Sequence, residues 1–179
     1  QLGEFSSLIG DLVQLSREDA PPPRPEIMDL ADVVARAVQR AKRRGPTMVF
    51  DVQTESQLVL GDSQAIERSV TNLLDNAVKF SPSGGRITVR MADETVTVAD
   101  EGPGISDEDL PHIFDRFYRS DQSRNTPGTG LGLSIVAHTV NSHGGWIKAS
   151  RAPGGGALFT MPLPTVDPDD VAGDESADS

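Results

Sequence analysis

The chain has 179 residues, 36% of them hydrophobic, which is enough for one well-buried domain with flanking segments. Its formal net charge of -11 argues against a nucleic acid or an anionic membrane surface as a partner, because both demand a basic surface. The absence of cysteine excludes disulfides, thiolate metal sites and a cysteine nucleophile. No apolar run approaches the roughly 18 residues that indicate a membrane helix, and no signal peptide is visible.

The two ends of the chain differ in character from its middle. Residues 1–18 carry apolar residues at helical spacing but no N-cap before Leu2, so we expect the end of a longer helix that pairs in a bundle or coiled coil; a peripheral helix of the same domain is the alternative. Residues 19–25 contain four prolines and predict a stiff linker. Residues 165–179 contain six acidic residues and no basic one, which is typical of a disordered tail. The candidate domain is therefore 26–164.

The first elements of this domain are a helix and two short strands. Residues 29–44 predict a helix, because acidic residues open the segment, basic residues close it, and Gly45 and Pro46 stop it. Residues 48–52 and 57–60 read as strands, followed by a turn and a cap at residues 61–63 that begin the next helix.

A polar stripe marks that next helix. Asn72, Asn76 and Lys79 stand at i, i+4 and i+7 and therefore share one helical face, while apolar residues occupy the opposite face. Two amides and an ammonium group in register can hold a hydrated cation and an anionic group. A merely solvated polar face is the alternative when the stripe is judged alone.

A hairpin then leads to an unusual acidic residue. Residues 87–91 and 95–99 alternate apolar and polar residues, as half-buried strands do, and a tight turn joins them. The same alternation places Asp100 on the buried side, where a carboxylate is costly unless a donor meets it. Gly102 and Gly104 allow the backbone to turn sharply and approach a ligand; ordinary turn chemistry is the alternative.

The remaining segments predict a short helix, a glycine loop and a last hairpin. Residues 107–118 read as a short helix with an apolar side, followed by a polar segment. The sequence GTGLGL at residues 128–133 runs into a helical pattern, and glycines that open a helix expose N–H groups to an anion. It is neither a Walker A loop nor a GxGxxG fingerprint. Residues 146–150 and 157–161 read as strands joined across glycines 154–156.

Taken together, these motifs resemble the catalytic ATP-binding domain of bacterial two-component sensor histidine kinases, within the superfamily shared with gyrase, the ninety-kilodalton chaperones and the mismatch-repair ATPases. In family terms NLLDNAVK at 72–79 is the N box, DEGPG at 100–104 the G1 box, IFDRFYR at 113–119 the F box, and GTGLGL the G2 box. The resemblance implies a two-layer α/β sandwich (α+β) in which helices cover one face of a mixed sheet, with ATP between the central helix and a mobile lid.

The resemblance also implies roles for individual residues. Asp100 would accept a hydrogen bond from the adenine amino group, Asn76 would coordinate Mg²⁺, and Asn72 and Lys79 would support the phosphates. Residues 106–127 would form the lid, with Phe114 and Phe117 as anchors. Arg119 would stabilise charge during transfer beside Tyr118, with Arg116 as a weaker candidate. The other implied nucleotide contacts are Gly102, Gly104, Ile105, Gly128, Thr129, Gly130, Leu131, Gly132 and Leu133.

One position distinguishes the branches of the superfamily. Water-activating relatives carry a glutamate general base four residues before the magnesium-binding Asn76, where this chain has Asn72. We therefore expect poor hydrolysis and transfer to an external acceptor, as in histidine kinases. The phosphoacceptor motif of the family is absent, and His112, His138 and His143 stand in other contexts where ordinary hydrogen-bonded roles are expected.

The expected function is thus transfer of the ATP γ-phosphoryl group to a histidine in a separate dimerisation domain, for relay to a response-regulator aspartate. Residues 1–18 resemble the end of the hairpin that carries this histidine, so the resemblance implies the cytoplasmic part of a membrane sensor, dimeric in the parent protein and monomeric as this fragment. An anti-sigma-type serine kinase of the same superfamily and a non-catalytic nucleotide-binding module are the alternatives.

Overall fold

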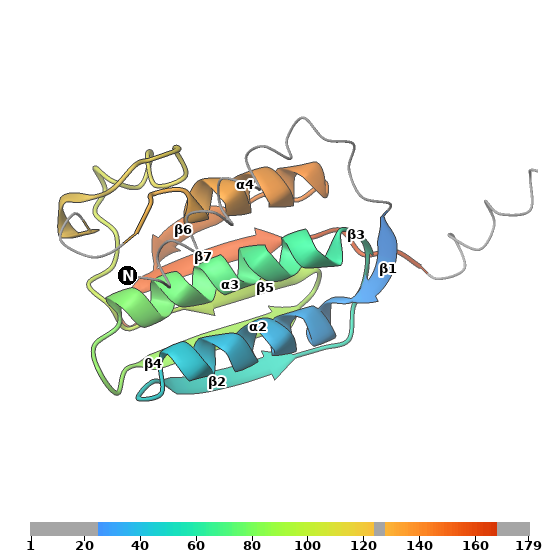
Figure 1. The fold of residues 1–179 in the computed structure, drawn as a ribbon, viewed down its shortest axis with the longest axis horizontal. Coiled ribbons are helices and arrows are strands. Elements are labelled where there is room, and N and C mark those ends of the chain that lie inside the picture. The colour runs from blue at the N-terminus through green and yellow to red at the C-terminus, as the bar shows by residue number, and fades with distance from the viewer. Residues whose placement is uncertain (1–24, 124–127, 168–179) are drawn as a thin grey trace, which may run out of the picture.

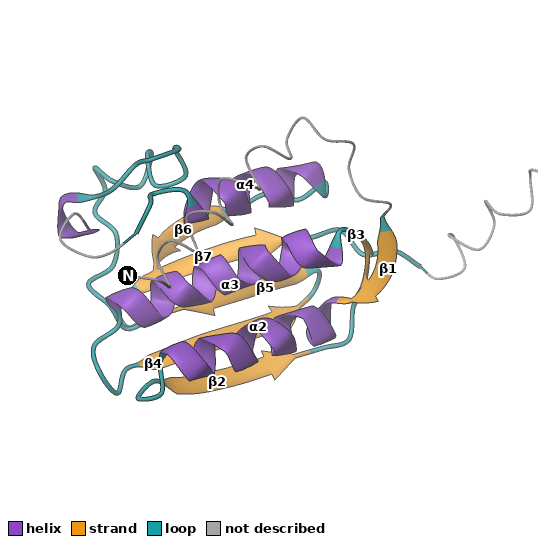
Figure 2. Ribbon diagram, in the orientation of Figure 1, coloured by secondary structure: helices purple, strands orange, loops and turns teal. Residues whose placement is uncertain are grey.

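The computed structural model describes residues 25–123 and 128–167, and these form a two-layer arrangement of helices on a sheet (Figures 1 and 2). The helices are α2 (Leu30–Arg44), α3 (Ser63–Phe80), the short 3-10 helix η2 (Asp121–Ser123) and α4 (Gly132–Ser142). The strands are β1 (Glu26–Asp29), β2 (Val49–Thr54), β3 (Leu58–Gly61), β4 (Arg86–Ala92), β5 (Thr95–Ala99), β6 (Lys148–Arg151) and β7 (Ala157–Pro162).

The main sheet has the strand order β2-β4-β5-β7-β6 and is mixed, because β2 runs parallel to β4 while the other neighbours are antiparallel. The helices α2, α3 and α4 lie side by side across one face of this sheet (Figure 2). The expected mixed sheet with helices on one face is confirmed. A separate pairing of β1 with β3 was not expected, since residues 26–29 carry no alternation long enough to predict a strand.

The hairpin of β4 and β5 follows the expected register. Asp93 and Glu94 form its turn with φ of 49° and 59°, the left-handed pair that matches the twist of a tight hairpin. Val96 and Val98 are buried by the helices. The alternation continues into Asp100, which is only 7% exposed. The sheet therefore directs a carboxylate into the layer where valines point, as the sequence predicts.

The core is the interface of the helices with this sheet. Apolar residues of α2 and α3 repeat at three- and four-residue spacing and bury one stripe of each helix. Its largest fully buried side chains include Leu30, Ile66, Leu73, Leu74, Ile87, Met91 and Met161. Because the apolar side of α3 is buried by the sheet and its neighbouring helices, its polar stripe must face away from the core.

Both long helices begin at aspartate caps. The side chain of Asp29 accepts from the N–H of Ala31, and that of Asp62 accepts from Gln64 and Ala65, each satisfying amides that have no partner inside the helix. The predicted helix at 29–44 therefore begins one residue later than expected. The Gly61-to-Ser63 cap is confirmed.

His143 joins the end of α4 to the start of α3. Its Nε2 accepts from the Asp62 N–H at 3.0 Å, and its Nδ1 lies 2.7 Å from the carbonyl oxygen of Thr139, which can only accept. These partners require the neutral tautomer protonated at Nδ1. The expectation of an ordinary hydrogen-bonded role holds for this histidine.

The predicted helix at 107–118 is wrong. The segment forms a series of turns, in which Ser106 accepts from the N–H of Asp109 with both its side chain and its carbonyl. Pro111 interrupts helical bonding because it has no N–H, and Phe117 adopts φ of 62°, outside the helical region. The apolar residues at 113, 114 and 117 have helical spacing in the sequence but lie in a compact irregular loop.

Several expectations concern residues outside the described part of the chain: the helix at 1–18, the linker at 19–24, residues 124–127 of the lid and the tail from 168 onward. Among the helices that the structure does describe, none combines the length and the hydropathy that a membrane crossing requires.

Truncating the core at Leu74 should destabilise the domain. This side chain is fully buried on α3, so Leu74→Ala should lower the free energy of unfolding by about 2–5 kcal/mol through lost burial and an unfilled cavity. Leu60→Ala is the matched control, because Leu60 is 39% exposed and should lose less than about 1 kcal/mol. Urea denaturation followed by circular dichroism measures both; equal losses would contradict this assignment of the core.

Candidate functional site

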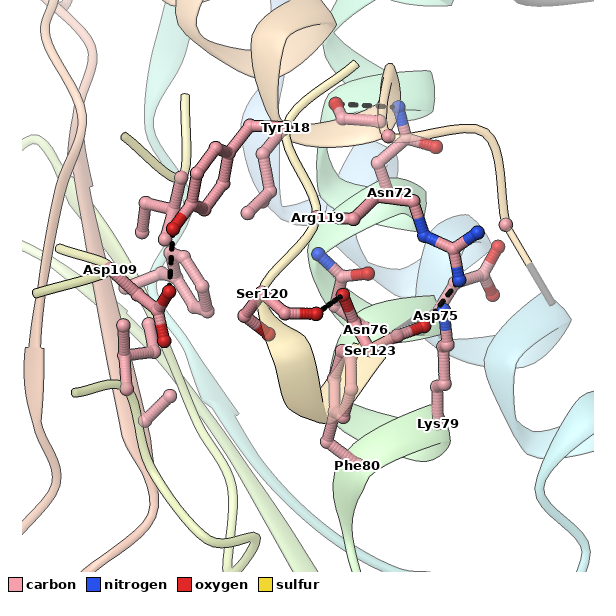
Figure 3. A pocket seen from close by; sticks show the side chains of 18 of the residues that line it. Asn72, Asp75, Asn76, Lys79, Phe80, Asp109, Tyr118, Arg119, Ser120 and Ser123 are labelled. Carbon is pink, nitrogen blue, oxygen red and sulfur yellow. Dashed lines mark hydrogen bonds between the residues drawn. The ribbon is translucent and has the colours of Figure 1, made fainter. Parts of the chain in front are cut away.

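A cavity of about 270 Å³ opens between the polar face of α3, the loop after β5, the lid at 106–123 and the glycine loop before α4 (Figure 3). The predicted residues that line it are Asn72, Asn76, Lys79, Asp100, Gly104, Ile105, Tyr118, Arg119, Gly128, Thr129, Gly130, Gly132 and Leu133. Two predicted contacts, Gly102 and Leu131, do not line it. The tertiary fold thus brings together residues as far apart in the chain as Asn72 and Phe159, 87 positions from each other.

The polar stripe of α3 forms one wall of the cavity. The side-chain N–H of Asn72 donates to the carbonyl oxygen of Gly132 at 3.2 Å and so ties α3 to the start of α4. Asn76 and Lys79 follow on the same face and line the cavity (Figure 3). A neutral amide, and no carboxylate, therefore occupies the position of Asn72.

Two cations approach each other at this wall. Burial lowers the pKa of Lys79 from its ordinary value, and the nearby guanidinium of Arg119 lowers it further. Arg119 also donates to the carbonyl oxygen of Ser123 within the lid (Figure 3). A Cβ atom on Gly128 would lie 3.0 Å from Lys79 Nζ, so the glycine loop lies directly against the ammonium group. An anion would relieve the repulsion between these cations.

A second wall contains the buried carboxylate of Asp100. Its Oδ1 accepts from the N–H of Gly102 at 2.8 Å and from the N–H of Ala157 at 3.0 Å. Burial raises the pKa of Asp100, and these two hydrogen bonds oppose that rise. Both bonds reach the same oxygen, which leaves Oδ2 as the acceptor available to a ligand.

The lid is organised around Asp109. One of its oxygens accepts from the hydroxyl of Tyr118 at 2.6 Å (Figure 3). The other accepts from the hydroxyl of Ser106 at 2.7 Å. These bonds lower the pKa of Asp109. Tyr118 therefore lines the cavity with its hydroxyl directed to the lid itself.

Only one of the two expected aromatic anchors packs against the core, where it is half-buried. The ring of Phe114 packs edge-on against Phe159 of β7 with a centroid distance of 6.4 Å. Phe117 is 67% exposed, so its ring does not anchor the lid, which corrects the expectation for this residue. Its backbone does, because its N–H donates to the carbonyl oxygen of Gly130 at 3.0 Å. Gly130 has φ of 74°, a conformation that favours glycine.

The remaining lining residues include several that motif reading did not identify as contacts: Asp75, Phe80, Pro103, Asp109, Ile113, Ser120, Ser123, Ala157 and Phe159. Asp75 lies beside Asn76 and forms an ion pair with Arg44 at the end of α2. Its presence in the wall follows from helical geometry, because residue 75 lies three positions after Asn72 and four before Lys79. Ala157 and Phe159 belong to β7, which lies far along the chain from most of the other motifs but pairs with β5 in the sheet. No local sequence pattern connects them to the site.

Comparison with known proteins places this geometry in a family. Residues 61–167 match the family described as Histidine kinase-, DNA gyrase B-, and HSP90-like ATPase. The chain is 47% identical over 173 residues to the signal transduction histidine-protein kinase/phosphatase MprB of Mycolicibacterium smegmatis, covering 92% of this chain and 35% of that protein. It is 40% identical over 194 residues to the MprB of Mycobacterium tuberculosis, covering 99% of this chain and 38% of that protein.

Solved structures give the same result. A mycobacterial sensor histidine kinase MprB structure has a TM-score of 0.72 and 36% identity, covering 79% of this chain and 100% of that one. The catalytic domain of the histidine kinase ThkA has a TM-score of 0.70 and 26% identity, covering 80% of this chain and 97% of that one. The chain spans little more than a third of the length of the MprB proteins. It belongs to the histidine kinase-, DNA gyrase B- and HSP90-like ATPase family, as an ATP-binding catalytic domain of the sensor histidine kinase type.

Proposed function

We propose that the chain binds ATP with Mg²⁺ in this cavity and transfers the γ-phosphoryl group to a histidine in another domain of its parent protein. The observation that carries the proposal is the combination, in one cavity, of a buried carboxylate with one free oxygen and a pair of mutually repelling cations beside a glycine loop. The first suits an amino group on a base, and the second suits phosphates.

Asp100 recognises adenine in this proposal. Its Oδ2 accepts a hydrogen bond from the amino group of the base, while Ile105, Ile113 and Phe159 supply apolar surface for the ring. Because the carboxylate is buried, a base without a donor leaves it unpaired, which penalises other bases. Gly104 lines the cavity beside it; Gly102 acts indirectly, by holding Oδ1.

The phosphates lie against Lys79, Arg119 and the backbone amides around Gly128, Gly130 and Gly132, where α4 begins. Thr129 stiffens the loop, since its hydroxyl accepts from the Leu131 N–H at 3.2 Å.

Asn76 supplies the protein ligand for Mg²⁺. The donor set fits this ion, which prefers oxygen ligands, keeps several waters and takes few groups from the protein when phosphates supply the others. Asn72, already bonded to Gly132, keeps Asn76 and the glycine loop in register. When bound, Mg²⁺ neutralises charge on the phosphates.

Transfer then requires an external nucleophile. An imidazole nitrogen of the acceptor forms a bond to the γ-phosphorus as the bond to the β–γ bridging oxygen breaks and ADP leaves, and the imidazole proton passes to solvent. Arg119 stabilises the developing charge, and Tyr118 shapes the lid beside it. Asn72 cannot act as a base on water, and Asp109 is engaged by Tyr118 and Ser106. This favours transfer over hydrolysis.

The acceptor and later partners belong to the proposal as well. We place the phosphoacceptor histidine on a dimerising hairpin, a response-regulator aspartate downstream of it, and the parent at the cell membrane with this domain on its cytoplasmic side. Support comes from the histidine-protein kinase relatives. In addition, both ring nitrogens of His143 are hydrogen-bonded within this domain, so this histidine is not available as the acceptor.

Asp100→Asn should separate binding from folding. The amide oxygen can still accept from Gly102 and Ala157, but the side chain can present an NH₂ group to the base, so measurable ATP binding should be lost. The unliganded variant should be as stable as the wild type or more stable at neutral pH. The reason is that the folded-state pKa of Asp100 is raised, so its stabilising contribution is present at acidic pH and is lost as pH rises through that pKa. Calorimetric titration and thermal unfolding measure the two effects; unchanged ATP affinity would refute the adenine assignment.

Asn76→Ala should remove the dependence of ATP binding on Mg²⁺. Wild-type affinity should fall by about tenfold or more when EDTA replaces Mg²⁺, and the variant should show little difference between the two conditions. Asn141→Ala is the matched control, because Asn141 is exposed on α4 and does not line the cavity. A variant that keeps the full Mg²⁺ effect would move the metal site elsewhere.

The full reaction is tested by supplying the missing acceptor. The chain alone should bind ATP but neither label itself nor hydrolyse ATP briskly, whereas addition of the histidine-bearing hairpin of the parent and radiolabelled ATP should give acid-labile label on the hairpin. Transfer to a serine protein with none to the hairpin would favour a serine kinase. Rapid release of phosphate by the chain alone would contradict the role given to Asn72.

A further inference from the structure

The turn between β6 and β7 contains three glycines, at positions 154 to 156, and packs against the start of the loop that follows β5. A Cβ atom on Gly156 would lie 1.9 Å from the carbonyl oxygen of Asp100 and 2.6 Å from its Oδ1. From the other side, a Cβ atom on Gly104 would lie 2.8 Å from the carbonyl oxygen of Gly155. Neither contact has room for a side chain, so the two loops approach at backbone distance.

This close approach decides the orientation of the Asp100 carboxylate. The next residue, Ala157, accepts from the Asp100 N–H at 3.0 Å through its carbonyl and donates its own N–H to Asp100 Oδ1 at 3.0 Å. With Gly102 holding the same Oδ1, the carboxylate cannot rotate without losing two hydrogen bonds, and Oδ2 remains the free oxygen. Any side chain at position 156 would push the Asp100 backbone away from Ala157.

We infer that Gly156 is a positioning residue for base recognition, acting through Asp100: its missing side chain lets Ala157 lock Oδ1, so that Oδ2 meets the 6-amino group of a purine. The inference rests on the proposed function, because it assumes that the base lies at Asp100. It assigns a binding role to a glycine run that the sequence explains as a turn.

The chain provides a matched control two residues away. A Cβ atom on Gly154 would meet nothing within 4 Å, and Gly154 does not have the left-handed φ of Gly155. Gly154→Ala and Gly156→Ala therefore make the same chemical change in the same turn, and only the second forces atoms into the Asp100 backbone.

The test compares ATP with purine riboside triphosphate, which has hydrogen in place of the 6-amino group, by calorimetric titration. Gly156→Ala should weaken ATP binding by about tenfold or more and leave the weak binding of the analogue within about twofold, because only ATP uses Oδ2. Gly154→Ala should match the wild type with both nucleotides. Equal effects of the two substitutions, or an equal loss of both nucleotides in Gly156→Ala, would overturn the inference.

Two further measurements keep the outcomes separate. If the wild type itself does not distinguish the two nucleotides, the adenine assignment fails whatever the variants do. If Gly156→Ala does not fold, as judged by circular dichroism, acid titration of the wild type by NMR replaces it. The amide signals of Gly102 and Ala157 should then shift with one midpoint as Asp100 protonates, and an Ala157 amide that does not respond would overturn the inference.

Discussion

The burial of one carboxylate at the end of a strand is the constraint on which the site depends. Strand alternation carries Asp100 to the side of the sheet where Val96 and Val98 are buried, and burial penalises its charge. Backbone N–H groups of Gly102 and Ala157 offset that penalty at one oxygen. The fold thus holds a buried carboxylate in a fixed orientation with hydrogen bonds to only one of its two oxygens. The other oxygen favours a ligand that donates a hydrogen bond.

The other side of the cavity carries two positive charges close together. Lys79 and Arg119 lie close enough beside the backbone that opens α4 for the guanidinium to lower the pKa of the lysine, and a neutral amide occupies position 72. A nucleoside triphosphate carries both complements, an amino group at one end and negative charge at the other. The lid supplies Arg119 and is itself held by Asp109, Phe114 and the backbone of Phe117, so the side of the cavity that carries the two cations is assembled by contacts of the lid.

Much of this could be predicted from local pattern. The face shared by Asn72, Asn76 and Lys79, the inward Asp100 and the hairpin turn at residues 93–94 all follow from periods of 3.6 and two and from turn chemistry. The lid could not be predicted in this way. Its apolar residues imitate a helix, but Pro111 lacks the N–H that a helix would need. Ile113 and Phe114 pack against the core from an irregular loop, while Phe117 is exposed.

By itself, the sequence determined which of the candidate residues share a face of their helix or strand, because helical and strand geometry are local. Only the tertiary structure decided which groups meet: that Asn72 bonds Gly132, that Asp75 pairs with Arg44, and that Ala157 locks Asp100. These contacts join residues 31 to 60 positions apart. Their geometry depends on how the sheet and helices pack, including the space left by a missing side chain at Gly156.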